Sequence, residues 1–275
     1  NYSPFLGNAI LISVGYWSQG RRSATVNAGL YPLLRIVTVP YFAHWDCHLK
    51  EDLLKRPRQV AVAFAGSIKD RPPYFVFRER LLVAGAVERA FKNDSRVLFE
   101  VFGATAAERT NFAREYKAHR SQLYSSADFC LAMPGDGNTA GRLFDAMMLG
   151  CIPVLLFHPD SYPVLPFVSR IPWHDFAVVA SMASEEQAGA ILQGLLDMPL
   201  AERQERRQRT LRYAPLVALS LQNCPSEVVS ALDLISMELQ DKVAMLRTAV
   251  LPGMQTATAP RSRDDWLLWG PSRPS

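Results

Sequence analysis

The sequence lacks any apolar run long enough to cross a membrane, and it contains few cysteines. None of its apolar runs reaches the ~20 residues of a membrane-spanning helix, and no signal peptide is visible at its start. The four cysteines, Cys47, Cys130, Cys151 and Cys224, are too few for a disulfide framework and lack paired zinc-site spacing. We expect Cys130 and Cys151, which fall in neighbouring apolar segments, to be buried free thiols. The alternative, in an oxidising compartment, is a disulfide between any two of these cysteines.

Neither sign of charge strongly predominates in the sequence. The net charge is +4, and no tract of Lys and Arg is dense enough to indicate a nucleic-acid partner. No Gly-Lys-Ser or Gly-Lys-Thr phosphate loop occurs, which argues against an ATPase of that kind. Two His, one Asp and one Cys gather between His44 and His48, but without a distant pair of ligands this cluster does not predict zinc. We therefore expect no metal site and no nucleic-acid partner.

The most informative stretch is residues 128–154, whose pattern is strand, loop, helix and strand. Short apolar runs at 129–133 and 152–157 predict two buried strands, and apolar residues at helical spacing predict a helix between them that stops at Gly150. Glycine suits that stop because it takes positive φ without cost. Such a unit places the helix N-terminus at the carboxyl edge of a parallel sheet, where open α/β sheets bind ligands.

Similar patterns precede and follow this unit. They predict further strands and helices at residues 60–65, 74–91, 96–103, 106–124, 177–180, 184–196, 200–221 and 226–246. Ser184 with Gln187 forms a capping-box signature at one of these helix starts. The predicted fold class is α/β, with a Rossmann-like parallel sheet flanked by helices.

The start of the central helix is a candidate anion site. Unpaired N–H groups and the helix dipole favour phosphate there, and Asn138 or Thr139 can either cap the helix or reach a phosphate. Arg142 lies in the first turn, where a cation opposes the dipole, so a bound anion explains it better than helix stability does. The alternative is an ion pair of Arg142 with Asp136 or Asp145. A free Asp145 carboxylate could instead accept two ribose hydroxyls.

A second loop at the same predicted edge opens at Gly66. Four cations follow it, namely Lys69, Arg71, Arg78 and Arg80. Two cations from this region meeting Arg142 would neutralise a diphosphate; the alternative is a solvated cluster at a helix start. Gly66 and Gly135, which break the chain after two of the strands, complete the candidate substrate-binding residues.

Five segments in this order resemble the exostosin-type glycosyltransferases, glycosyltransferase family 47. They lie at residues 125–136, 142–146, 150–154, 165–167 and 171–176, and include Arg-Leu-Phe-Asp-Ala and Gly-Cys-Ile-Pro-Val. The resemblance implies a GT-B architecture, in which two Rossmann-like domains face each other across a cleft and the second holds most of the nucleotide-sugar. It also implies transfer of a sugar onto a growing glycan on the lumenal side of the Golgi membrane.

The resemblance also predicts how the chain is divided. Family members carry a membrane anchor and an N-terminal domain, so we expect this chain to be a piece of a longer, membrane-anchored protein that forms homo- or hetero-oligomers. The expected parts are residues 1–57 as a remnant of the N-terminal acceptor-side domain with its linker, 58–250 as the nucleotide-sugar-binding domain, and 251–275 as a disordered tail.

The predicted function is transfer of a sugar from a UDP-sugar to a glycan or glycoprotein acceptor. Basic groups would stabilise the departing diphosphate, so no metal or other cofactor is expected. A general base is a carboxylate or His in the cleft; the weak candidates are His44, Asp46 and Asp160, and the catalytic residue is otherwise unknown.

Two other functions remain open. An NAD(P)-dependent oxidoreductase would need a glycine pattern one residue shorter than the one from Gly135 to Gly141. It would also need an acidic residue after the next strand, where the chain has Phe157 and His158. The other possibility is an inactive or truncated relative that binds a nucleotide-sugar, or serves as a partner subunit, without turnover.

Overall fold

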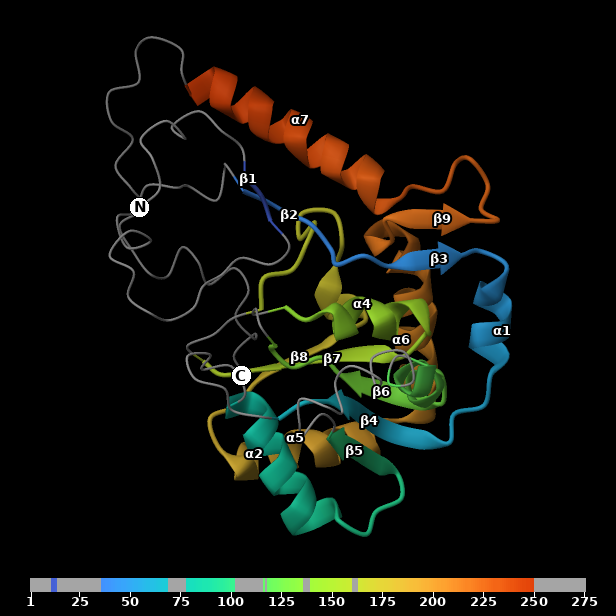
Figure 1. The fold of residues 1–275 in the computed structure, drawn as a ribbon, viewed down its shortest axis with the longest axis vertical. Coiled ribbons are helices and arrows are strands. Elements are labelled where there is room, and N and C mark those ends of the chain that lie inside the picture. The colour runs from blue at the N-terminus through green and yellow to red at the C-terminus, as the bar shows by residue number, and fades with distance from the viewer. Residues whose placement is uncertain are drawn as a thin grey trace.

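A parallel β-sheet of five strands lies at the centre of the molecule (Figure 1). The computed structural model describes residues 11–13, 36–68, 78–101, 116, 118–135, 139–159 and 163–249. The five strands are β4 (Val60–Gly66), β5 (Val97–Val101), β6 (Ala127–Leu131), β7 (Ile152–Phe157) and β8 (Val178–Ser181). Every residue of β6 and β7 is buried, as expected of central strands covered on both faces. The predicted α/β fold with a Rossmann-like parallel sheet is confirmed.

Helices cover both faces of the sheet. Two of them, α2 (Arg78–Ala86) and α5 (Glu185–Asp197), pack in a core with Phe64 and Phe129. The opposite face carries α4 (Gly141–Met148), α6 (Leu200–Tyr213) and the helix over residues 118–125. Because successive side chains of a strand point to opposite faces, Phe64 faces α2 while its neighbours Ala63 and Ala65 face the other layer.

The strand order of this sheet creates a topological switch point at one edge. The order is β5-β4-β6-β7-β8, so the chain adds β5 on one side of β4 and then crosses to add β6 on the other. The connections after β4 and after β6 therefore leave the sheet in opposite directions. In doubly wound α/β proteins, ligands bind at the carboxyl ends of the two strands that flank such a switch point.

Smaller elements surround the central sheet. Two pairs of parallel strands, β1 (Leu11–Ser13) with β2 (Ile36–Thr38) and β3 (His44–Asp46) with β9 (Ser220–Gln222), form separate small sheets. The remaining elements are α1 (Leu49–Lys55), a π-helical turn η3 (Val87–Phe91), the 3₁₀ turns η4 (Trp173–Asp175) and η5 (Ala214–Val217), and α7 (Ala231–Ala249). Within the described ranges no helix is long and apolar enough to cross a bilayer.

One predicted element needs correction. The helix predicted over 200–221 ends at Tyr213, because Pro215 breaks it, and the chain continues as η5 and β9. Residues 1–57, predicted to be a remnant of an N-terminal domain with its linker, include β3 and α1. The predicted domain boundaries stay a prediction, and residues 251–275 lie outside the described residues.

Two local predictions are confirmed. Gly150 follows α4 with a φ of 64°. At the start of α5, Ser184 Oγ accepts a hydrogen bond from the Gln187 backbone, and the Gln187 side chain accepts one from the backbone of Ala183.

The expectation of free thiols is wrong. Cys130 in β6 bonds to Cys151 just before β7, and Cys47 bonds to Cys224, so all four cysteines form disulfides. Cys130 and Cys151 are fully buried. Adjacent buried strands brought the two thiols to a Cα–Cα distance of 5.8 Å, which is within the range that a disulfide spans.

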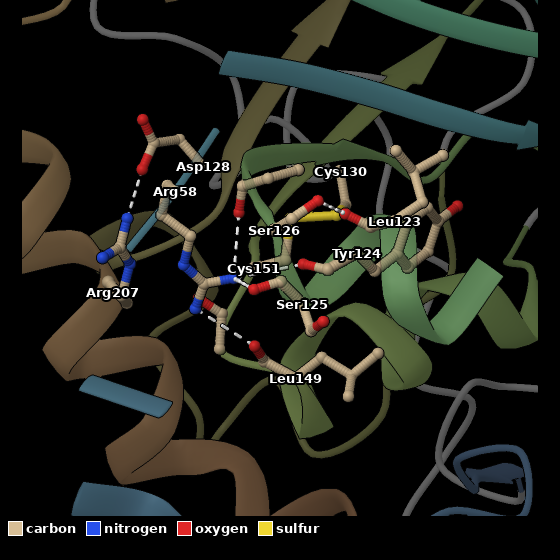
Figure 2. Close-up of a disulfide and its surroundings, with 12 residues drawn as sticks. Arg58, Leu123, Tyr124, Ser125, Ser126, Asp128, Cys130, Leu149, Cys151 and Arg207 are labelled. Carbon is tan, nitrogen blue, oxygen red and sulfur yellow. Dashed lines mark hydrogen bonds and ion pairs between the residues drawn. A yellow bond between two sulfur atoms is a disulfide. The ribbon is translucent and has the colours of Figure 1, made fainter. Parts of the chain in front are cut away.

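Arg58 holds the opposite, amino edge of the sheet together (Figure 2). Its guanidinium donates to carbonyl oxygens at the C-terminal ends of three helices, which lie at Leu53, at Tyr124 and Ser125, and at Leu149 and Gly150. The last carbonyls of a helix have no partner within it and carry its negative dipole end. One half-buried cation therefore satisfies three helix ends at once.

Asp128 supplies a negative charge beside this cation. It pairs with Arg203 at 2.7 Å and with Arg207, and Figure 2 shows Arg207 and Arg58 side by side. Burial and then the charge of Arg207 lower the pKa of Arg58 to about 10, while Asp128 acts in the opposite direction. The cluster packs α6 against the amino end of β6 and so lies at the end of the sheet opposite to the switch point.

Candidate functional site

Arg142 lies in the first turn of α4 and reaches over the carboxyl end of β4. Its Nε donates a hydrogen bond to the carbonyl oxygen of Ala65 at 3.1 Å. Its Cζ atom lies 5.5 Å from the centre of the Phe64 ring. Since Phe64 belongs to the face covered by α2, the side chain of Arg142 passes from one face of the sheet to the other at this edge.

Arg80 approaches the same point from α2. It is buried, with 2% of its surface exposed, and its Nη1 donates to the carbonyl oxygen of Ser67, just after β4. Its Cζ lies 5.9 Å from the Phe64 ring centre. Of the two candidates in this helix start, Arg80 is therefore the one that the structure brings to Arg142, while Arg78 is exposed.

The two guanidiniums lie close to two glycines, where a side chain on either glycine would collide with them. A Cβ at Gly66 would lie 2.9 Å from Nη2 of Arg142 and 2.6 Å from the tip of the Phe64 ring. A Cβ at Gly135 would lie 2.9 Å from Nη2 of Arg80 and 3.9 Å from Nη1 of Arg142. The two guanidiniums thus flank the loop after β6, between the ends of β4 and β6, which is the switch point of the sheet.

A buried carboxylate that the sequence analysis missed lies at the same edge. Glu79, the neighbour of Arg80, is 4% exposed, and its Oε1 accepts a hydrogen bond at 3.1 Å from the backbone N–H of His158 after β7. It ties the start of α2 to the end of β7. Nothing in the sequence separates it from an ordinary first-turn Glu that complements a helix dipole.

The start of α4 differs from the prediction. Its N-cap is Ala140, which makes no side-chain cap. Thr139 is buried and its hydroxyl donates a hydrogen bond to the carbonyl oxygen of Val164, so it does not cap the helix, and its contact with a phosphate stays a prediction. The ring of Tyr41 packs here, because a Cβ on Gly141 would lie 3.6 Å from it.

Asp145 faces the helix that precedes β6. It forms an ion pair with Arg120 at 2.6 Å. The alternative role of Asp145 was an ion pair with Arg142, and the structure shows such a pair with Arg120 instead. The buried hydroxyl of Tyr124 lies within the electrostatic reach of Arg142 and Arg120. A ribose would have to replace Arg120 as the partner of Asp145, and that role stays a prediction.

The candidate bases in β3 have local partners. His44 Nδ1 lies 3.1 Å from Ser220 Oγ, and its Nε2 lies 3.0 Å from Gln222 Oε1. Asp46 accepts hydrogen bonds from the backbone of His48 and from the side chain of Asn223. In Figure 1, β3 and β9 lie at the upper right, whereas α2, which carries Arg80, lies at the lower left. The structure does not bring either residue to the arginines.

Four further candidates lie outside the described residues: Lys69, Arg71, Asn138 and Asp160. Within the described part of the chain, no group of three His, Cys, Asp or Glu side chains is placed to hold a metal ion. Among the described residues, Arg80 and Arg142 bring positive charge to the switch point, and the buried carboxylate of Glu79 lies at the same edge. Two guanidiniums beside strand ends can bind phosphate oxygens bidentately and stabilise negative charge that develops on a leaving group.

The chain is similar to plant glycosyltransferases. It is 28% identical over 142 residues to the xyloglucan galactosyltransferase MUR3 of Arabidopsis thaliana, covering 48% of this chain and 22% of that protein. It is 29% identical over 153 residues to the probable beta-1,4-xylosyltransferase IRX10L of the same plant, covering 52% of this chain and 31% of that protein. The chain thus spans less than a third of the length of these relatives.

Solved structures of glycosyltransferases show a more distant likeness. Anabaena Alr3699/HepE, in complex with UDP and glucose, matches with a TM-score of 0.43 and 11% identity, covering 87% of this chain and 64% of that one. The C-terminal domain of a Francisella tularensis glycosyl transferase (LpcC) matches with a TM-score of 0.36 and 13% identity, covering 67% of this chain and 97% of that one. The family model for the exostosin GT47 domain matches residues 7–195, which is more than half of the chain, and the chain therefore belongs to the exostosin GT47 family of glycosyltransferases.

Proposed function

We propose that this chain carries the nucleotide-sugar site of a GT-B glycosyltransferase that moves a sugar from a UDP-sugar to a glycan acceptor. The observation that carries the proposal is the meeting of Arg80 and Arg142 at the switch point of the sheet. This is the edge at which doubly wound sheets bind nucleotides. Two cations there suit the diphosphate of such a donor better than they suit an uncharged ligand.

The arginines would serve both binding and catalysis. Transfer breaks the bond between the anomeric carbon and the diphosphate, which leaves with an additional negative charge. Fixed cations that bind the leaving group more strongly as that charge grows lower the barrier. The acceptor hydroxyl must lose a proton to a base, for which Asp160, outside the described residues, stays a candidate.

The disulfides support a lumenal location. Two disulfides that use all four cysteines fit an oxidising compartment such as the Golgi lumen. The names of the plant relatives, a xyloglucan galactosyltransferase and a xylosyltransferase, support a polysaccharide acceptor. Membrane anchoring and oligomer formation belong to the same proposal for the whole protein.

Calorimetric titration with UDP and with NAD tests the donor class. We expect UDP to bind and NAD not to bind, and we expect Arg142→Ala to weaken UDP binding by about tenfold or more, as loss of one charged hydrogen-bonding group does. Arg209→Ala, on the exposed side of α6, is the matched control and should leave UDP binding unchanged. Binding of NAD in place of UDP would overturn the proposal. UDP binding without any sugar transfer by the full-length protein would identify an inactive relative instead.

A further inference from the structure

One aromatic ring lies against both arginines of the switch point. The Phe64 ring centre is 5.9 Å from Cζ of Arg80 and 5.5 Å from Cζ of Arg142. The ring is fully buried, and Phe99 stacks on it with a centroid distance of 4.6 Å. The two arginines come from helices on opposite faces of the sheet, so Phe64 is the group that they share.

Two guanidiniums drawn to one point repel each other, and they do so more strongly where water is excluded. The face of an aromatic ring carries negative charge density and attracts a cation within ~6 Å of its centre. An aliphatic side chain of similar volume would fill the core equally well but would attract neither arginine. The choice of an aromatic residue at this position therefore offsets part of the repulsion.

We propose that Phe64 is the positioning residue of the anion site. Its ring holds Arg80 and Arg142 in place for a diphosphate, and because it is buried it need not touch the substrate itself. Gly66 and Gly135 contribute by leaving room for the guanidiniums. This inference rests on the proposed function, because the diphosphate that the two arginines bind is that of the proposed UDP-sugar donor.

Pre-arranged arginines bind an anion more tightly, since the ligand does not have to gather them against their mutual repulsion. A lower electron density on the face of the Phe64 ring should therefore weaken UDP binding, while the arginines stay the same and the core volume stays nearly the same. A purely structural role for Phe64 predicts a different result. In that case UDP affinity would follow the stability of the fold and not the electron density of the ring.

The test replaces Phe64 in the full 275-residue chain by phenylalanine carrying one, two or three ring fluorines. The dissociation constant for UDP is measured by calorimetry, and the melting temperature is measured in parallel. We expect UDP binding to weaken stepwise with fluorine number, reaching on the order of tenfold for the trifluorinated ring, at a nearly constant melting temperature. Phe129 is the matched control, because it lies in the same core and among the described residues no arginine lies over its ring.

The outcomes separate this inference from the proposed function. If the natural chain binds UDP and Arg142→Ala weakens that binding, but fluorination of Phe64 has no effect, the positioning role is overturned and the function stands. An equal effect of fluorination at Phe129 also overturns it. If the natural chain binds no UDP at all, the proposed function fails and this inference fails with it.

Discussion

The guanidinium of Arg80 lies where a side chain at Gly135 would be, 2.9 Å from the position of the missing Cβ. The loop after β6 and the start of α2 are therefore fitted to each other through a glycine and an arginine. Contacts this close are rarely tolerated, but the guanidinium is the far end of a flexible side chain and can move. Changing the glycine should thus displace the arginine and leave the core intact.

Gly135→Ala should accordingly weaken UDP binding more than it lowers stability. We expect a loss of about threefold to tenfold in affinity, as for displacement of one charged hydrogen-bonding group, with a change in unfolding free energy of less than about 1 kcal/mol. Calorimetry and denaturant unfolding measure the two quantities. Gly194→Ala in α5, where a Cβ would have nothing within 4 Å, is the control and should leave UDP affinity unchanged. Equal affinities for Gly135→Ala and the natural chain would contradict the assigned position of the site.

Arg58→Ala should be strongly destabilising, because it leaves buried carbonyl oxygens at three helix ends without their donor. We expect a loss of about 3 kcal/mol or more in unfolding free energy, since each unsatisfied buried group costs ~1 kcal/mol or more. Arg58→Lys should recover only part of this, because an ammonium cannot reproduce the planar fork of donors. Urea unfolding followed by circular dichroism is the measurement. The exposed Arg209→Ala should stay within about 0.5 kcal/mol of the natural chain, and a similarly small loss for Arg58→Ala would refute the role of this cation.

Tyr124 should make stability fall at alkaline pH. Burial raises the pKa of its hydroxyl from 10.0 to about 12, while the charge of Arg142 acts against the shift. Between these values the unfolded chain has lost a proton that the folded protein keeps, so stability is present below pH 10 and is lost as the pH rises toward 12. A shift of this size corresponds to about 2 to 3 kcal/mol.

Comparison with Tyr124→Phe isolates this effect, since other alkaline titrations, such as that of Arg58, occur in both proteins. We expect the Phe variant to equal or slightly exceed the natural chain in stability at pH 8, because the buried hydroxyl has no hydrogen-bond partner among the described residues. Its advantage should grow when unfolding free energies are measured at pH 11. A constant difference between pH 8 and pH 11 would show that the hydroxyl titrates normally.

The two disulfides should differ in their response to reductant. Cys130 and Cys151 are fully buried, whereas Cys47 and Cys224 are partly exposed, and exchange requires access of a thiolate to a sulfur atom. Under native conditions with dithiothreitol, we expect alkylation to label Cys47 and Cys224 first and the buried pair only upon unfolding. Mass spectrometry of the labelled peptides gives the order. Simultaneous labelling of all four cysteines in a still-folded protein would contradict this.

Removal of the buried disulfide measures its contribution. The double variant Cys130→Ala with Cys151→Ala should lose about 3 kcal/mol of unfolding free energy, as expected for closure of a loop of this length. The variant should remain folded at 25 °C, because the surrounding strands are wholly buried. A loss of less than about 0.5 kcal/mol would show that the bridge contributes little to the stability of the fold.

The sequence alone determined the central β-loop-α-β unit, its place in a parallel sheet and the family resemblance. Apolar runs at 129–133 and 152–157 have the length and composition of fully buried strands, and Gly150 has one conformational role after a helix. These are properties of neighbouring residues, so local patterns suffice to predict them. The anionic ligand, inferred from Arg142 as a cation at an unfavourable place in its own helix, stays a prediction.

Only the tertiary structure decided which residues meet. Cys130 and Cys151, Glu79 and His158, and the set of carbonyls around Arg58 are brought together by strand order and by helix ends that are distant in sequence. The sequence left a bridge between any two cysteines as an alternative, and it gave no signal for the other two sets. Arg80 was separated from Arg78 in the same way, since neighbouring positions of a helix point in different directions and only packing shows which one faces the sheet. Local sequence patterns thus specified the strands and helices. The connection from β5 across to β6 then created the switch point at which Arg80 and Arg142 converge.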